Sequence, residues 1–163
     1  MYDIGLGGNS QKWMVDHYEL LGFRFRRIVG WEAEPLDPAE MWSRVPTVAK
    51  KARITYFNIP ATANRYDGDN PLTHLRALAT PQDYVVLKID VDVPPLELPL
   101  VLAISKSTEL QALIDEFYWE HHVIKSPMAF IAWPWVDRST TLADSFRLFS
   151  HLRHKGIRAH SWV

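Results

Sequence analysis

Two kinds of side chain in this sequence could do chemistry: carboxylates at the ends of apolar stretches, and a pair of adjacent histidines. They are Asp3, Glu32, Asp90, Asp92, Glu120, His121 and His122. A carboxylate can accept both hydrogen bonds of a ribose diol, and a neutral imidazole can accept a proton near pH 7. The residues therefore suggest binding of a nucleotide-like ligand and acid–base chemistry, provided that the fold brings them together.

Glycines follow the first of these carboxylates. Asp3 is succeeded by Gly5, Gly7 and Gly8 in the pattern D-x-G-x-G-G. Glycine lets the main chain approach a ligand where a Cβ would collide, and the N–H groups that open a following helix point into the same space. We expect Asp3 and the three glycines to contact a ligand that contains adenosine.

Alternating apolar patterns predict the elements that would position these residues. Strands are expected over residues 2–5, 23–31, 54–59, 84–91, 114–123 and 157–163. Helices are expected over residues 11–21, 39–44, 71–79, 96–104, 108–113 and 139–155. Strands that alternate with helices indicate a parallel sheet with right-handed crossovers. We expect an α/β fold: a Rossmann-like three-layer sandwich, with a mostly parallel sheet of about six strands flanked by helices.

In such a sheet, ligands bind beyond the carboxyl ends of the strands. Glu32 ends the second expected strand, where a carboxylate commonly accepts hydrogen bonds from ribose, and Glu34 is the alternative. Asn58 ends the third, beside the expected adenine position. The plainer interpretation of Glu32 is a solvated acid that leaves a strand.

The fourth and fifth strands deliver further candidates to the same edge. Asp90 and Asp92 alternate, so they face opposite ways unless the strand has ended, and Asp92 could instead cap the next helix. His121 or His122 could serve as a general base, or both could be structural. Together with Glu120 they could bind zinc, iron or manganese, but adjacent strand residues face opposite ways, so we expect no metal.

Two segments resemble a known family. The pattern that starts at Asp3 looks like motif one of class I S-adenosylmethionine-dependent methyltransferases, in which the acid helps to hold the amino-acid end of the cofactor. The stretch Val86–Asp92, followed by Glu97, is similar to the lysine–apolar–aspartate–apolar–acid segment of FkbM-type methyltransferases. The likeness extends loosely over residues 2–123.

The resemblance implies S-adenosylmethionine as the cofactor and methylation of a hydroxyl on a small molecule or sugar. It also favours Asp90 as the carboxylate on the cofactor side. The expected cofactor-binding residues are Asp3, Gly5, Gly7, Gly8, Glu32 and Asn58. The expected catalytic residues are Asp90, His121 and His122, one of which would deprotonate the hydroxyl.

The sequence departs from the family at several points. Val93-Pro94-Pro95 stands where the family usually has a glycine, and neither the usual closing antiparallel strand nor an N-terminal segment over the cofactor is evident. We therefore expect one domain over residues 1–163, or a fragment that lacks this N-terminal cap. A catalytically inactive binding or interaction module of the same fold is the alternative function. A nicotinamide-dependent oxidoreductase ranks third, because Asp3 and Ser10 depart from the G-x-G-x-x-G pattern.

Amino-acid composition narrows the classes of function that remain open. The chain has 163 residues, 47% of them hydrophobic and 23% charged, and its net charge of −1 gives no electrostatic case for nucleic acid or a membrane surface. The absence of cysteine excludes disulfides and thiolate zinc sites. No apolar run approaches the roughly 20 residues of a membrane span, and no signal peptide is evident, so we expect a cytoplasmic protein. The aromatic run Phe130–Trp135 could support self-association.

Overall fold

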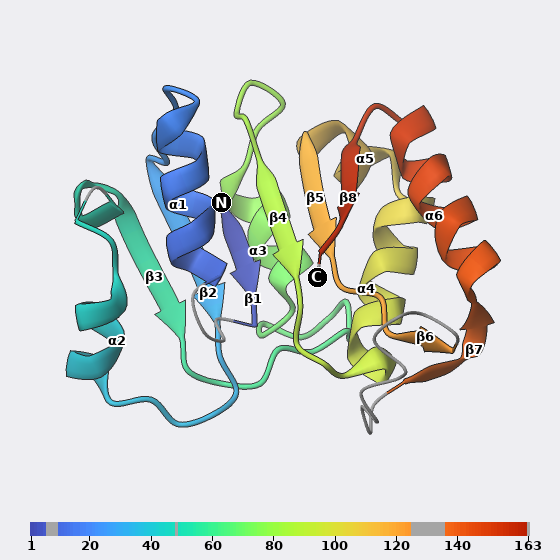
Figure 1. The fold of residues 1–163 in the computed structure, drawn as a ribbon, viewed down its shortest axis with the longest axis horizontal. Coiled ribbons are helices and arrows are strands. Elements are labelled where there is room, and N and C mark those ends of the chain that lie inside the picture. The colour runs from blue at the N-terminus through green and yellow to red at the C-terminus, as the bar shows by residue number, and fades with distance from the viewer. Residues whose placement is uncertain (6–9, 48, 125–135, 163) are drawn as a thin grey trace.

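The computed structural model describes residues 1–5, 10–47, 49–124 and 136–162 (Figure 1). Its main strands are β1 (Tyr2–Ile4), β2 (Arg27–Trp31), β3 (Arg53–Phe57), β4 (Val86–Ile89), β5 (Glu116–Trp119) and β8 (Arg158–Ser161). Its helices are α1 (Ser10–Leu20), α2 (Pro38–Arg44), α3 (Pro71–Leu78), α4 (Pro94–Lys106), α5 (Thr108–Leu113) and α6 (Leu142–His154), with a single 3-10 turn, η1 (Ala49–Lys51). Two short strands, β6 (Val123–Ile124) and β7 (Asp137–Thr141), pair separately.

The six main strands form one sheet in the order β3-β2-β1-β4-β5-β8, and every pairing is parallel. Helices cover both faces, so the expected Rossmann-like three-layer sandwich is confirmed, with a sheet that is wholly parallel rather than mostly so. The strand that closes the sheet, β8, is parallel to β5. The strand order reverses between β1 and β4, which places the topological switch point there.

Two apolar clusters hold the layers together. One packs the sheet against α3, α4, α5 and α6, and it includes Leu75, Leu100 and Phe149. The other packs the sheet against α1 through Met14 and Val15. Strands covered on both faces are buried along their length, as all four residues of β4 are, and the apolar run Val85–Leu87 at its start explains why the sequence pattern predicted it.

The helices begin where the sequence offers caps. The Asp37 side chain accepts hydrogen bonds from the N–H groups that open α2, and Asn70 accepts one at the start of α3. At α6, Thr141 and Asp144 form a capping box. The expected helix start at Ser139 was wrong, because Asp137–Thr141 pairs with β6 as a strand.

The fifth strand also differs from its expected bounds. It ends at Trp119 and not at Val123, so His121 and His122 lie in the connection beyond it. Within the described residues, no helix combines the length and the apolar character that a membrane crossing requires.

Candidate functional site: a crevice at the switch point

A cavity of about 910 Å³ opens at the carboxyl edge of the sheet. Its walls come from the ends of β1, β2 and β4, from residues 60–64 after β3, and from residues 91–96. This edge lies along the bottom of Figure 1, towards which the strand arrows point. The location is the switch-point crevice in which doubly wound folds bind their ligands, and the volume suits a ligand of nucleoside size.

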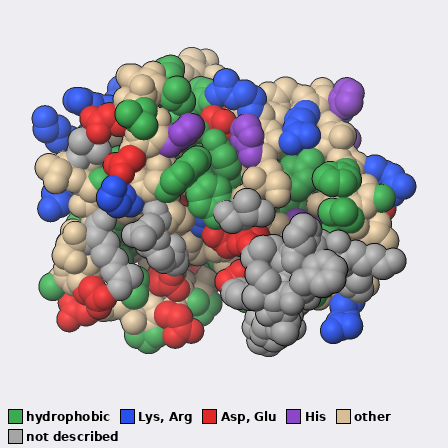
Figure 2. All heavy atoms as spheres, viewed as in Figure 1, with side chains coloured by type: hydrophobic (Ala, Val, Ile, Leu, Met, Phe, Trp, Pro, Cys, Tyr) green, Lys and Arg blue, Asp and Glu red, His purple; other side chains and the backbone are tan. Residues whose placement is uncertain are grey.

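The wall of this crevice is acidic. Its carboxylates are Glu32, Glu34, Asp90 and Asp92, and the described lining includes no lysine, arginine or histidine. Figure 2 shows acidic side chains gathered from the lower left to the centre of this face. Apolar side chains, among them Trp31 and Leu36, supply much of the remaining wall. Such a wall favours a ligand that is neutral or positively charged and opposes one that carries phosphate groups.

A buried lysine lies behind this wall. The Lys88 side chain has no exposed surface, and its Nζ lies 2.9 Å from Asp90 Oδ2 and 3.3 Å from Asp3 Oδ1. It also donates a hydrogen bond to the carbonyl oxygen of Gly5. Burial acts to lower the pKa of Lys88, but the two carboxylates outweigh it and raise the pKa, so this lysine is charged and paired.

Asp3 therefore faces Lys88 and does not line the crevice. It is fully buried, directly opposite Lys88 in the pairing of β1 with β4. Both residues are evident in the sequence. The strand register that places them opposite each other is not, because it depends on segments far apart in the chain. Asp3 supports the strand ends from inside, in a role different from the expected cofactor contact.

Gly5 lines the crevice, but its glycine requirement has a cause within the protein. Its φ is +90°, and a Cβ at this position would lie 1.7 Å from the carbonyl oxygen of Asp90. The main chain of Asp90 thus fills the space that was expected for a ligand. Gly7 and Gly8 lie outside the described residues.

Glu32 stands at the end of β2 as expected and lines the crevice. Its Oε1 accepts a hydrogen bond from the Glu34 N–H at 3.0 Å. Asn58 is absent from the lining. Its amide donates to the carbonyl oxygens of Glu32 and Glu34 and accepts from the Leu36 N–H at 3.0 Å. Asn58 therefore clamps the segment that carries the two glutamates, in place of the direct ligand contact expected from sequence.

Asp92 adopts an unusual main-chain conformation at the crevice wall. Its φ is 59°, in the left-handed region. The buried Glu97 carboxylate holds this turn by accepting hydrogen bonds from the N–H groups of Val91 and Asp92, at 2.8 and 3.2 Å, and from the Trp119 ring at 3.1 Å. Asp92 is not the helix cap that the sequence allowed, because the N-cap of α4 is Val93.

The Asp92 side chain meets two residues from beyond β5. Its Oδ1 lies 2.9 Å from Nε2 of His122, a nitrogen that is also 3.7 Å from Oε1 of Glu120. Burial, with Asp90 and Asp92 close by, raises the pKa of Glu120 to about 8. One ligand atom from each of Asp92, Glu120 and His122 lies within 4.8 Å of the others.

His121 points elsewhere. Its Nδ1 lies 3.0 Å from Ser145 Oγ and its Nε2 lies 3.2 Å from Asp137 Oδ2, while its ring stacks on Trp119 with centroids 3.8 Å apart. Burial lowers the pKa of His121 in spite of Asp137. The two adjacent histidines thus have different partners, as expected, and neither is among the residues that line the crevice.

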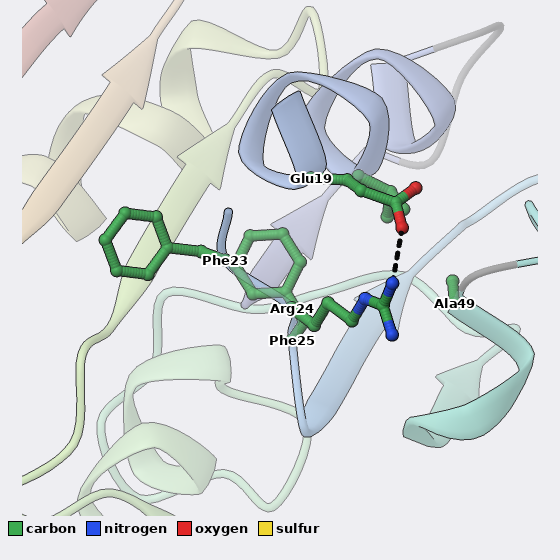
Figure 3. A pocket seen from close by; sticks show the side chains of 6 residues that line it. Glu19, Phe23, Arg24, Phe25 and Ala49 are labelled. Carbon is green, nitrogen blue, oxygen red and sulfur yellow. Dashed lines mark ion pairs between the residues drawn. The ribbon is translucent and has the colours of Figure 1, made fainter. Parts of the chain in front are cut away.

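A second, much smaller pocket lies beside the C-terminal end of α1. Figure 3 shows its lining, which includes Phe23, Phe25 and an ion pair of 3.2 Å between Glu19 and Arg24. Its volume of about 10 Å³ holds no more than a single water molecule. The crevice at the carboxyl edge is therefore the better candidate site.

Comparison with protein-family models, curated proteins and solved structures finds no match to this chain. The fold and the chemistry of the crevice are therefore the observations that bear on function. The aromatic run Phe130–Trp135, expected to support self-association, lies outside the described residues.

Proposed function

We propose that this chain binds S-adenosylmethionine in the crevice and methylates a hydroxyl of a small molecule or sugar. The observation that carries the proposal is the acidic wall at the switch point, which includes four carboxylates and, among its described residues, no basic side chain. A sulfonium ion with a ribose diol suits this wall, because carboxylates attract the cation and accept hydrogen bonds from hydroxyls. The resemblance of Val86–Asp92, which includes two of these carboxylates, to FkbM-type methyltransferases also supports the proposal.

Each part of the crevice has a proposed role in holding the cofactor. Glu32 would accept hydrogen bonds from the ribose hydroxyls. Trp31, Leu36 and residues 60–64 offer the apolar surface for adenine. Asp90, fixed in place by Lys88, would lie on the side of the positively charged methionine part.

When bound, S-adenosylmethionine supplies an electrophilic methyl group, so the chain must position a hydroxyl and remove its proton. Asp92 is the best placed candidate for the base that removes this proton, because it lines the crevice and 43% of its side chain is exposed. Asp90 is paired with Lys88, while His121 and His122 are outside the described lining. His122 would then orient Asp92 through their 2.9 Å contact.

The alternatives fit the crevice less well. A nicotinamide dinucleotide carries a pyrophosphate, which the four wall carboxylates would repel. A catalytically inactive binding module would retain the fold without the cofactor. A measurement of S-adenosylmethionine binding distinguishes this module from the proposed enzyme.

A thermal-shift experiment tests the proposal. We expect S-adenosylmethionine and its demethylated product to raise the melting temperature, and NAD to leave it unchanged. Glu32→Gln should weaken binding of both ligands by about tenfold or more, because a charge-assisted hydrogen bond is lost. Glu109→Gln, a matched change at an exposed carboxylate on α5, should retain wild-type binding.

Two outcomes contradict the proposal. Well-folded protein that responds to neither methyl-donor ligand would favour the inactive module. A shift with NAD alone would favour the oxidoreductase.

A further inference from the structure

We propose that Asp92, Glu120 and His122 form a binding site for a divalent first-row transition-metal cation at the wall of the crevice. This site can be tested without the methyltransferase proposal, but a bound cation would replace the direct contact between Asp92 and His122 and would withdraw Asp92 from the role of base. From the sequence we expected no metal, because two adjacent histidines on a strand face opposite ways and cannot easily bind one ion. The structure places a single histidine, together with two carboxylates, around a common point.

The distances between the three donors fit one ion. Ligand atoms held about 2.1 Å from a metal lie about 3–3.4 Å from each other in tetrahedral or octahedral geometry. The His122 Nε2 atom lies 2.9 Å from Asp92 Oδ1 and 3.7 Å from Glu120 Oε1. All three ligand atoms lie within 4.8 Å of one another, so side-chain rotations that move these atoms by about 1 Å would bring them to coordination distance.

Charge at this position also favours a cation. Glu120 interacts electrostatically with Asp90, Asp92 and Glu97, all of them carboxylates. Lys88 pairs with Asp90 but is shared with Asp3, so the carboxyl groups around the cluster are in excess of the lysines that pair with them. A divalent cation between Asp92 and Glu120 would relieve this excess.

The neighbouring contacts hold the donors in position. Asp92 follows β4, and Glu120 and His122 follow β5, so adjacent parallel strands deliver all three to one place. Glu97 fixes the left-handed turn at Asp92 by binding its N–H group. The His122 residue is 3% exposed, so packing determines the orientation of its ring.

The donor set selects the class of cation. One imidazole nitrogen with carboxylate oxygens suits Mn²⁺, Fe²⁺ and Zn²⁺, whereas Mg²⁺ and Ca²⁺ prefer oxygen alone. Three protein ligands leave coordination positions open. Because Asp92 lines the crevice, an oxygen of a small molecule bound there could take one of these positions.

Titration of metal-stripped protein with Mn²⁺ tests the site, with free Mn²⁺ followed by electron paramagnetic resonance. Neither cofactor nor substrate is present, so failure of the methyltransferase proposal would not affect the result. We expect one tight site per chain. His122→Gln and Glu120→Gln should each weaken binding about tenfold or more.

Matched variants make the test specific. His121→Gln removes the adjacent imidazole, and Glu34→Gln removes a carboxylate from another part of the crevice wall, so both should bind Mn²⁺ as the wild type does. Asp92→Asn, at a partly exposed side chain, provides a second ligand variant if His122→Gln does not fold.

The proposal is overturned if folded wild-type protein binds no Mn²⁺. It is equally overturned if Asp92→Asn and Glu120→Gln retain wild-type affinity. His151 and His154 lie one turn apart, exposed, at the C-terminal end of α6 and are the alternative ligands for a cation. Binding that is lost only in a His151→Gln/His154→Gln variant would place the ion there and contradict the assignment.

Discussion

At the scale of single residues, Lys88 explains how the strand ends behind the crevice are held together. It joins Asp3 of β1, the carbonyl oxygen of Gly5 and Asp90 beyond β4. A lone lysine in an apolar strand gives a sequence-based signal that an acidic partner is needed. The identity of that partner depends on strand register, which the local pattern does not contain.

Lys88→Met should destabilise the protein by about 3–5 kcal/mol, because it leaves buried carboxylates without their cation. The free energy of unfolding in urea measures the loss. Adding Asp3→Asn should recover part of it, because one of the uncompensated charges is removed. Equal stability of wild type and Lys88→Met would show that the ion pairs do not hold the strand ends together.

The lowered pKa of Asp137 makes part of the folding stability depend on pH. Burial opposes the shift, but hydrogen bonds from Ser139, Thr140 and His121 lower the pKa of Asp137 from 3.8 to about 2. The folded state then binds fewer protons than the unfolded state between these values, so this contribution is present above pH 4 and is lost as pH falls towards 2. Asp137→Asn should unfold with a weaker dependence on pH over that window, as followed by circular dichroism. An unchanged dependence would contradict the assignment.

At the scale of elements, the strands were predictable and their ends were not. The apolar run Val85–Leu87 and the cap Asp37 before Pro38 marked their elements locally. The β6–β7 pair was not predicted, because Asp137–Thr141 is polar and lacks an alternating apolar face. The fifth strand was extended over His121 and His122 for the opposite reason, because the apolar residues Val123 and Ile124 follow them, although these two residues pair with β7 and not with the main sheet.

The junction of β1 with β4 gives a sharp test of packing. Gly5→Ala should cost more than about 4 kcal/mol or prevent folding, because the added Cβ would overlap the Asp90 carbonyl and φ is positive. Gly68→Ala is the control, because nothing lies within 4 Å of its Cβ position. Thermal unfolding of the two variants provides the comparison. If Gly5→Ala and Gly68→Ala melt alike, the close contact between β1 and β4 is wrong.

The hydrogen bonds by which Asn58 holds the segment after β2 can be tested by substitution. Asn58→Ala removes three hydrogen bonds that hold residues 32–36, so Glu32 should lose its fixed position. Because Asn58 is exposed, we expect a loss of stability within about 1 kcal/mol but a clear loss of affinity for S-adenosylmethionine. Calorimetry and chemical denaturation separate the two effects. Wild-type affinity in this variant would show that the clamp does not position the ligand-binding wall.

At the scale of the whole molecule, the fold followed from the alternation of strands and helices, and with it the edge at which ligands bind. The candidate residues did not converge as expected. Glu32, Asp90 and Gly5 reached the crevice, whereas Asp3, Asn58, His121 and His122 support it or lie beside it. Residue type and chain order therefore located the edge of the sheet, while contacts between distant segments decided which side chains face the ligand.

The central claim is that this acidic crevice selects a positively charged adenosyl ligand. Calorimetric titration of the protein with S-adenosylmethionine, repeated in the presence of excess NAD, tests it most directly. We predict one bound molecule per chain and an isotherm that NAD does not alter. Absence of binding heat at several temperatures, or displacement of the ligand by NAD, would contradict the claim.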